Sequence, residues 1–439
     1  MDRKKIINGF SKLLKGDKIK WLAENFSTGN DQLYKTYSTY FHQDEQLQKL
    51  HDGFSENTIT NFFMPYSIAP NFLIDGKVYA VPMVIEESSV VAAASSAAKF
   101  WMERGGFHTE IVDVIKVGHV SFKWNGTLDE IKKKQDAIKK YLIEETKLHT
   151  SNMESRGGGL KYMEFVSVPN LNSIFQLRAH FDTCNSMGAN FINTILESYA
   201  SSLEMFFAED RELNSHGPLE IILSILSNYT PECLVKVWVE CHVDQLNIAS
   251  NPADNIRDLA YKFKSAVEIA QNDIYRATTH NKGIYNGIDA VVLATGNDFR
   301  AIEAAGHAYA ARKGSYSSLS ACTIDNDIFR FSLEVPLALG TVGGLTSLHP
   351  LAKNSLEILG NPDAKQLMSI IGSVGLAQNF AALKSLVTTG IQKGHMKMHL
   401  QNILIHLGAT DHQKEKAITW FADKTVSHAA VREFLDKNE

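Results

Sequence analysis

Four short segments carry side chains that suit acid–base and electrostatic catalysis. The first holds two adjacent carboxylates, Glu86 and Glu87, directly after the apolar run 80–85. Neighbouring residues of a strand face opposite ways, so one carboxylate can be buried while the other is solvated. A buried carboxyl at this point could act as a general acid. The alternative is a solvated charge at a strand end.

The second segment, THNKGIYNGID (279–289), combines amides, a histidine and Lys282 with two glycines. Its composition predicts a polar, turn-rich loop whose backbone can approach a ligand closely. A lysine in such a loop could clamp a negative charge or form a Schiff base. The alternative is a lysine on a surface turn.

Asp298 and His395 complete this set. Asp298 ends ATGND (294–298), which we interpret as an apolar strand that runs into a turn, a frequent position for site residues in α/β folds. It could equally cap the following helix. His395 lies in GIQKGHM and is of the type that protonates leaving groups near neutral pH, although a single histidine is more often structural.

The elements expected to position these residues begin with a β-hairpin over 71–85, which has an Asp-Gly turn in its middle. The alanine-rich helix after it would begin at the N-cap residues Ser88 and Ser89 and stop at a pair of glycines. Glu87 would therefore lie just before a helix N-terminus.

A small α/β domain is expected between residues 111 and 228, inserted into a larger one. Its expected elements are strands at 111–123, 161–168 and 174–182, helices at 131–149 and 190–207, and another apolar element at 219–227. Elsewhere we expect mainly helices, over 1–60, 255–275, 299–313, 362–407 and the C-terminal tail, with a hairpin at 320–339.

The composition excludes several classes of protein. The chain has 439 residues, of which 44% are hydrophobic and 21% charged, and a net charge of -5. Such mild acidity argues against a general nucleic-acid binder, and no uninterrupted apolar run is long enough to span a membrane. Its four cysteines form no CxxC pair, which favours a reducing compartment. We therefore expect a cytoplasmic protein with neither a membrane nor a nucleic acid as partner.

The N-terminal segment is basic but lacks the apolar core of a signal peptide. Its apolar residues recur at helical spacing, so we expect an amphipathic helix over 1–22.

Two glycine-containing loops, 185–190 and 340–344, could hold phosphates or a nicotinamide. Neither matches the Rossmann or P-loop pattern. Because HExxH, GxSxG and EF-hand motifs are absent from the sequence, we predict neither a metal site nor a serine hydrolase. Chemistry alone thus predicts an enzyme with a Glu, Lys, Asp and His site.

Longer motifs occur in order along almost the whole chain. They are ENTIT (56–60), NFLIDGKVYAVPMVIEESSVVAAAS (71–95), NSMGAN (185–190), YRATTHNKGIYNGIDAVVLATGND (275–298), GTVGG (340–344), GLAQN (375–379) and GIQKGHM (390–396). Together they resemble the soluble bacterial class, class II, of 3-hydroxy-3-methylglutaryl-coenzyme A reductase. The resemblance implies an NAD(P)H-dependent four-electron reduction of 3-hydroxy-3-methylglutaryl-CoA to mevalonate and CoA, or the reverse oxidation. Each hydride transfer creates an oxyanion, and one step expels a thiolate.

The resemblance also implies a role for each polar residue. Lys282 would stabilise the oxyanion, and Glu87 would protonate the aldehyde oxygen. Asp298 would hold Lys282 and keep Glu87 in its acidic form. His395 would protonate the departing thiolate.

Binding residues follow from the same motifs. Substrate contacts would be Ser89, Arg276, Asn286 and Asn379, with Asn57 in the motif associated with CoA; Arg276 suits the free carboxylate of the substrate. Cofactor contacts would be Asn185, Met187, Gly188, Asn190, Asn228, Val342, Gly343 and Gly344. The cofactor would be NADPH or NADH, and lysines of the 131–149 helix favour NADPH.

Four positions depart from the family pattern. Thr60 stands where the family usually has Gly, Ser88 where it has Pro, Asn185 where it has Asp, and Leu345 where it has a third Gly. Three of these positions lie in the CoA or cofactor motifs. The expected contacts with CoA and with the cofactor are therefore the ones that the departures affect.

We therefore expect an α+β multidomain fold. Residues 1–110 and 229–388 would form a large, mainly helical CoA- and substrate-binding domain, 111–228 a small ferredoxin-like NAD(P)-binding domain, and 389–439 a C-terminal flap with His395. The expected assembly is a homodimer, or an oligomer of dimers, with sites at the subunit interface. The alternatives are a non-catalytic CoA-binding paralogue and an acyl-CoA hydrolase with Glu87 as base.

Overall fold

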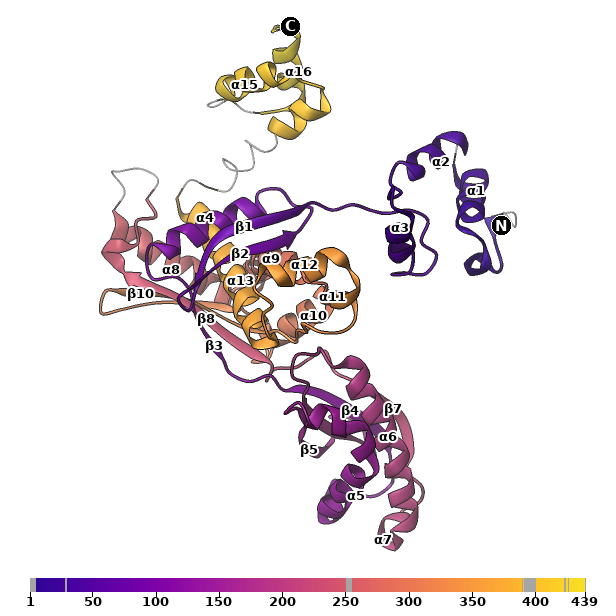
Figure 1. The fold of residues 1–439 in the computed structure, drawn as a ribbon. Helices are drawn as coiled ribbons and strands as arrows, with labels where there is room; N and C mark the ends of the chain where they lie inside the picture. The colour runs from indigo at the N-terminus through magenta and orange to yellow at the C-terminus, as the bar shows by residue number, and fades with distance from the viewer. Residues whose placement is uncertain are drawn as a thin grey trace. The chain divides into compact units, whose positions relative to one another are not determined.

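The computed structural model describes residues 5–27, 30–249, 255–388, 390, 400–421, 424 and 426–438. The chain divides into two compact units, Met1–Pro65 and Tyr66–Glu439, which are described separately (Figure 1).

The first unit is helical, as expected. It contains a short 3₁₀-helix, η2 (Phe10–Lys12), and the helices α1 (Lys15–Phe26), α2 (Asn30–Ser38) and α3 (Glu45–Asp52). The amphipathic helix expected over 1–22 begins only at Lys15. Gly9 is left-handed with φ of 76° and Leu14 is extended, so the chain turns before α1 can start. The helical spacing of the apolar residues before Lys15 was therefore not a helix signal.

The second unit opens with the expected hairpin, β1 (Tyr66–Ile74) and β2 (Lys77–Val84). Asp75 and Gly76 both have positive φ, 47° and 81°, as a two-residue hairpin turn requires. Helix α4 (Val90–Met102) follows and packs on β1. Ser89 holds its N-cap position but makes no capping bond, because its backbone is itself left-handed with φ of 73°.

The small sheet of this unit has the strand order β5-β6-β4-β7, with all pairs antiparallel. The chain order is β4 (Lys116–Lys123), α5 (Leu128–Glu154), β5 (Gly159–Ser167), β6 (Ile174–Asp182), α6 (Ala189–Glu209), α7 (Arg211–Asn214) and β7 (Glu220–Leu226). This β-α-β-β-α-β order is the split βαβ arrangement. Helices α5 and α6 bury one face of the sheet in a hydrophobic core of its own. The strand expected over 111–123 begins only at Lys116, because Ile111 ends β3 (His108–Ile111), which joins the other sheet.

The larger part of the unit surrounds a second antiparallel sheet, β3-β8-β10-β9, built from β8 (Leu234–His242), β9 (Ser320–Asp325) and β10 (Ile328–Pro336). β9 and β10 form the hairpin expected at 320–339. Around this sheet the chain forms η3 (Val243–Gln245), α8 (Ile256–Asn272), α9 (Ile274–Ala294), α10 (Phe299–Ala310), α11 (Leu345–Leu348), α12 (Pro350–Ile358) and α13 (Ala364–Val387).

Helix α9 corrects the interpretation of residues 279–298. The expected loop and strand are one 21-residue helix. Its glycines allow close packing rather than turns: a Cβ on Gly287 would lie 2.8 Å from the Val374 carbonyl oxygen of α13. His280, Ile284, Ile288 and Val291 are buried, a spacing of three and four residues that is typical of one helix face.

Helix α13 is long and apolar enough to cross a membrane by composition, but 72% of its apolar window is buried inside the structure. It is therefore a core helix of this unit. In the C-terminal part of the chain, α15 (Asp411–Trp420) and α16 (His428–Asp436) share a small apolar cluster.

Candidate active site

The structure brings Glu87 and Lys282 into contact. The Lys282 ammonium donates to Glu87 Oε2 at 2.5 Å, and the Asn286 amide donates to the same oxygen at 3.3 Å. Lys282 and Asn286 lie one turn apart on α9, while Glu87 comes from the connection between β2 and α4. The side chains are 60% (Lys282) and 35% (Glu87) exposed, so both charges can reach a ligand.

This pair lies in a cavity of about 1010 Å³ between α4, α9 and α13. Of the residues expected to contact substrate, Ser89, Arg276, Asn286 and Asn379 all line it. Residues from three distant parts of the sequence therefore meet in one cavity, as the resemblance implied.

A buried polar network supports one wall of this cavity. The His280 Nε2 atom lies 2.6 Å from the Ser320 hydroxyl, and that hydroxyl donates to Asn379 Oδ1 at 2.8 Å. Burial, and then the charge of Arg276, lower the pKa of His280 to about 3, so the ring is neutral at pH 7. Asn379 therefore holds α13 in place through Ser320, a residue that sequence analysis did not single out.

Asp298 does not join the pair within one chain. It caps α10, where its carboxylate accepts from the Arg300 and Ala301 amides and lies 3.1 Å from the Arg300 guanidinium. The alternative interpretation of Asp298 as a helix cap is therefore confirmed. Lys282 lies twelve residues before the end of α9, about 18 Å along the helix axis, and Asp298 is not among the described residues that line the cavity.

The two expected cofactor loops lie against each other. The Thr341 amide donates to the Asn185 carbonyl oxygen at 2.9 Å, and Ser186 and Val342 form a parallel bridge. The same surface continues to the Asp298 turn, because the Gly340 amide donates to Asn297 Oδ1 at 2.8 Å. Asp298 thus belongs with the cofactor loops rather than with the Glu87–Lys282 pair.

Lys116 holds the loop 185–190 through a hydrogen bond from its side chain. Its buried ammonium donates to the Thr183 hydroxyl at 2.7 Å and the Ser186 carbonyl oxygen at 3.1 Å, and burial lowers its pKa. Sequence analysis missed this residue, although a lysine inside the apolar run VIKVGHV is unusual enough to signal it.

The loops suit a dinucleotide. Helix α6 starts directly after Gly188, with no side chain capping its first amides, and free amides at a helix N-terminus attract phosphates. Gly343 and Gly344 have positive φ and open space beside them, which allows close backbone approach. Met187 and Asn228 line a small cavity together, and Asn190 is the second residue of α6.

Two expected contacts have a different setting, and one expected catalytic residue is not described. The Asn185 side chain accepts from the Ala364 amide at 3.0 Å, so it caps α13 rather than facing open space. Asn57 lies in the first unit with a left-handed φ of 60°. His395 lies outside the described residues.

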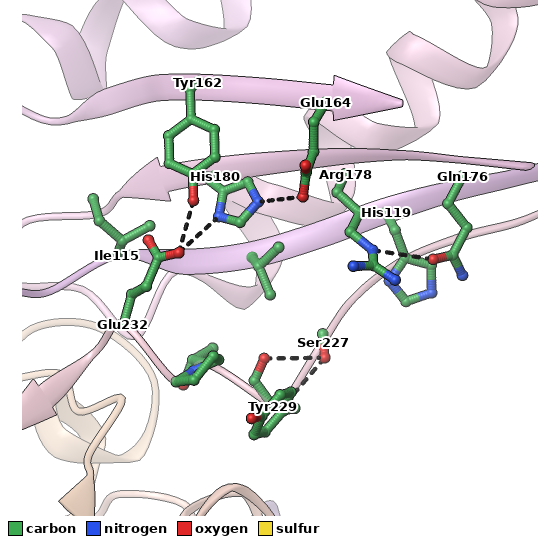
Figure 2. A pocket seen from close by; sticks show the side chains of 13 residues that line it. Ile115, His119, Tyr162, Glu164, Gln176, Arg178, His180, Ser227, Tyr229 and Glu232 are labelled. Carbon is green, nitrogen blue, oxygen red and sulfur yellow. Dashed lines mark hydrogen bonds and ion pairs between the residues drawn. The ribbon is translucent and has the colours of Figure 1, made fainter. Parts of the chain in front are cut away.

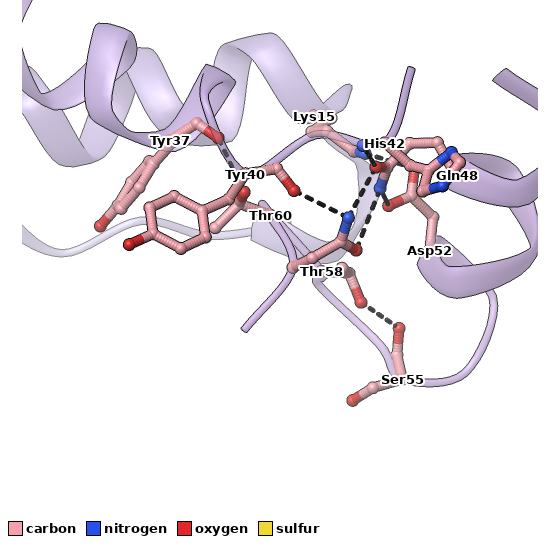
Figure 3. A network of polar contacts seen from close by, with 10 residues as sticks. Lys15, Tyr37, Tyr40, His42, Gln48, Asp52, Ser55, Thr58 and Thr60 are labelled. Carbon is pink, nitrogen blue, oxygen red and sulfur yellow. Dashed lines mark hydrogen bonds and ion pairs between the residues drawn. The ribbon is translucent and has the colours of Figure 1, made fainter. Parts of the chain in front are cut away.

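The departure Thr60 has a structural explanation in the first unit (Figure 3). Its hydroxyl donates to the Tyr37 carbonyl oxygen at 2.8 Å, and the Asn61 amide beside it donates to the Tyr40 carbonyl oxygen at 2.8 Å. Together they tie the 56–61 segment to the end of α2. At another departure, Leu345 is the first residue of α11 and is 42% exposed.

A second cavity, of about 410 Å³, lies on the sheet face that α5 and α6 leave open (Figure 2). Among its buried polar residues is His180, which stacks on Tyr162 at 3.9 Å and lies within 3.9 Å of both Glu164 and Glu232. Burial lowers the pKa of His180, while the two carboxylates oppose the shift. None of the predicted site residues lines this cavity, so the cavity with the Glu87–Lys282 pair is the candidate active site.

Comparisons with known proteins show the family of the chain. A family model described as hydroxymethylglutaryl-coenzyme A reductase matches residues 17–400. A 3-hydroxy-3-methylglutaryl-coenzyme A reductase of Archaeoglobus fulgidus is 36% identical over 418 residues, which cover 94% of this chain and 89% of the relative.

Solved structures are also similar. One is the class II 3-hydroxy-3-methylglutaryl-CoA reductase from Streptococcus pneumoniae bound to NADPH in open conformations, with 36% identity and a TM-score of 0.71 over 87% of this chain and 99% of that chain. Another structure of the S. pneumoniae reductase shows 34% identity and a TM-score of 0.71 over 98% of this chain and 99% of that chain.

Proposed function

The chain belongs to the hydroxymethylglutaryl-coenzyme A reductase family and reduces 3-hydroxy-3-methylglutaryl-CoA to mevalonate, and we propose that its Glu87–Lys282 pair performs the polar steps of this reaction. The observation that carries the proposal is the 2.5 Å contact between these two side chains in a large cavity lined by Arg276 and Asn379.

Lys282 would stabilise negative charge on the reacting oxygen. Its ammonium has three donor hydrogens, of which one goes to Glu87. The remaining donors can bond the oxygen of the thioester carbonyl and, later, of the aldehyde. The bond strengthens as the oxygen becomes an oxyanion, so it lowers the barrier more than it tightens ground-state binding.

Glu87 would exchange a proton with that same oxygen. It touches Lys282 directly, so both groups reach the oxygen together. Asn286, which donates to the Glu87 carboxylate, holds it in this orientation. His395 would supply the proton to the departing thiolate, and Arg276 would pair with the free carboxylate of the substrate.

The cofactor, NADPH or NADH, supplies the two hydrides when bound. Ser186, Met187 and Gly188 at the start of α6, with Val342 and Gly343 from the facing loop, would hold it. We assign cofactor binding to residues 111–228 with a ferredoxin-like fold, substrate binding to 1–110 and 229–388, and the flap to 389–439. The protein would act in the cytoplasm.

The separation between Lys282 and Asp298 supports a shared site. If Asp298 acts on Lys282, a second copy of the chain must supply it, together with the cofactor loops that lie beside it. The functional unit would therefore be a homodimer in which each site combines the Glu87–Lys282 pair of one chain with the Asp298 turn of the other.

The assay follows the loss of nicotinamide absorbance with 3-hydroxy-3-methylglutaryl-CoA. Lys282→Ala should lower kcat by about 10²–10³-fold, for this substrate and for free mevaldehyde, because both reductions pass through an oxyanion. Mevaldehyde reduction at the wild-type rate by this variant would exclude the role. A wild-type chain that binds CoA but consumes no cofactor would favour the non-catalytic paralogue.

A further inference from the structure

The cavity on the open face of the small sheet, which we call the sheet-face cavity, is separate from the candidate active site (Figure 2). Its volume of about 410 Å³ falls within the usual range of small-molecule sites. Gln176, Arg178 and His180 alternate along β6, so their side chains reach this face together. Neither Glu87 nor Lys282 lines it, and the reduction gives it no role.

An arginine and a glutamate face each other across this sheet without pairing. Glu164 of β5 is the register partner of Arg178 of β6, and opposite side chains on one face are close enough to interact. The Glu164 carboxylate instead lies 3.8 Å from His180 Nε2, and Arg178 Nε donates to Gln176 Oε1 at 3.2 Å. Within the described part of the chain Arg178 forms no ion pair. The terminal nitrogens of its guanidinium are therefore left for a ligand.

Two carboxylates flank the other end of the cavity. Glu164 and Glu232 lie 3.8 and 3.9 Å from the two ring nitrogens of His180, and Glu232 also accepts from the Tyr162 hydroxyl at 2.7 Å. Among the described residues no lysine or arginine pairs with either carboxylate. Burial lowers the pKa of His180, so its ring does not compensate them at pH 7. The two side chains are 48% and 42% exposed, which leaves both charges accessible to a ligand.

This pattern of charges selects one kind of ligand. A plain anion on Arg178 would meet the two carboxylates, and a plain cation would meet Arg178. A zwitterion satisfies both ends, with its carboxylate on the guanidinium and its ammonium on the glutamates. Arg178 and His180 are about 7 Å apart along the strand. An ammonium and a carboxylate on one carbon, with a hydrogen bond of about 2.8 Å at each end, span such a gap.

The remaining walls of the sheet-face cavity suit an apolar group. Ile115, Val117 and Pro231 line it beside the charged residues. A small zwitterion that carries an apolar side chain would therefore bury that side chain against them.

One wall of the sheet-face cavity is shared with the cofactor loops. Ser227 and Thr230 line this cavity and also the small cavity that Met187 and Asn228 line. The Thr230 hydroxyl is buried and has no hydrogen-bond partner among the described residues, so its side chain does not fix the wall in one position. A ligand packed against this wall would thus change the setting of Asn228 on its other side.

We propose that the sheet-face cavity is an effector site for an α-amino acid with an apolar side chain, and that its occupation changes the affinity of the enzyme for the nicotinamide cofactor. Arg178 binds the carboxylate, and Glu164 and Glu232 bind the ammonium. The effect on the cofactor rests on the proposed function, which assigns Met187 and Asn228 to cofactor binding. The binding itself does not depend on that assignment.

The first test is isothermal titration calorimetry of the full chain with L-leucine. N-acetyl-L-leucine lacks the ammonium and L-leucinamide lacks the carboxylate, so we expect each to bind about tenfold more weakly than L-leucine. Arg178→Met should weaken L-leucine binding about tenfold, and Arg178→Lys should weaken it less because the charge remains. The matched control is Arg211→Met, an exposed arginine of α7 outside both cavities, which should bind L-leucine as wild type does. Thermal unfolding of each variant confirms that it is folded.

No saturable binding of L-leucine to wild type would overturn the proposal, as would equal binding by Arg178→Met. Equal binding of N-acetyl-L-leucine would show a site for plain anions and would overturn it too.

The second test measures KM for NADPH with and without saturating L-leucine. We expect a change of at least twofold in wild type and in Arg211→Met, and none in Arg178→Met, because two coupled sites alter each other's affinity. An unchanged KM in an enzyme that binds L-leucine would refute the coupling. A chain that binds L-leucine but oxidises no cofactor would instead refute the proposed function and leave the amino-acid site supported, so the two failures are distinguishable.

Discussion

Two different inactive variants should restore each other's activity if the active site is shared between chains. We take Lys282→Ala, which removes the oxyanion contact, and Asp298→Asn, which removes a charge beside the cofactor loops. Asparagine caps a helix as well as aspartate does, so α10 should remain intact. Gly188 is a poorer choice, because any Cβ there would lie 2.4 Å from the Thr183 side chain and disturb the loop itself.

The expected recovery follows from the geometry. Within one chain, α9 carries Lys282 about 18 Å from the end of the helix that precedes Asp298. In a heterodimer with a shared site, one site therefore carries both defects and the other carries neither. A dimer purified on both tags is always a heterodimer with one of its two sites intact, so about half of the wild-type activity per dimer should return.

The assay is cofactor oxidation by co-expressed variants with different affinity tags, after purification on both tags. The matched control combines Lys282→Ala with Glu87→Gln. These residues touch within one chain, so every site of that heterodimer keeps one defect and no activity should return. An inactive but confirmed heterodimer of Lys282→Ala and Asp298→Asn, or a chain that remains monomeric, would refute the shared site.

Three further predictions concern His395, His280 and the cofactor. His395→Gln should impair reduction of 3-hydroxy-3-methylglutaryl-CoA more than that of mevaldehyde, because only the first reaction expels a thiolate; equal impairment would indicate a structural histidine. The folded-state pKa of His280, about 3, lies below its unfolded value of about 6.5, so below pH 6.5 the unfolded chain takes up a proton that the folded chain does not. Stability is therefore lost as the pH falls. Between pH 6.5 and 5 the free energy of unfolding, measured with urea, should fall by about 2 kcal/mol more for wild type than for His280→Gln; equal losses would contradict the burial of a neutral ring. We expect kcat/KM to be higher with NADPH than with NADH, because the lysines of α5 favour NADPH, although one of them, Lys134, already pairs with Asp210 and Glu212. Steady-state kinetics with the two cofactors would measure this, and a higher kcat/KM with NADH would contradict the expectation.

Helix α9 shows where local sequence signals mislead. Its segment HNKGIYNG has the glycines and amides of a loop, and we predicted a loop. Gly287 instead lets the backbone of α13 pack closely against α9. The Asn281 side chain donates to the Ser317 carbonyl oxygen and accepts from the Leu319 amide. Packing and buried hydrogen bonds thus outweigh the low helix propensity of these residues.

The sequence alone determined the elements whose signals are local and the family to which the chain belongs. The hairpin at β1 and β2 depends on an Asp-Gly pair between apolar runs, and α5 and α6 on apolar periodicity, so short windows of sequence suffice. The motifs around Glu87, Lys282 and Arg276 were recognised as a set without any knowledge of distance. Only the tertiary structure decided which of these residues meet. Glu87 and Lys282 are 195 residues apart and touch, whereas Lys282 and Asp298 are 16 residues apart and do not, because the second half of α9 separates them. Separation along the chain does not determine separation in space, because a rigid helix holds near neighbours apart and the packing of α4 and α13 on α9 brings distant residues together.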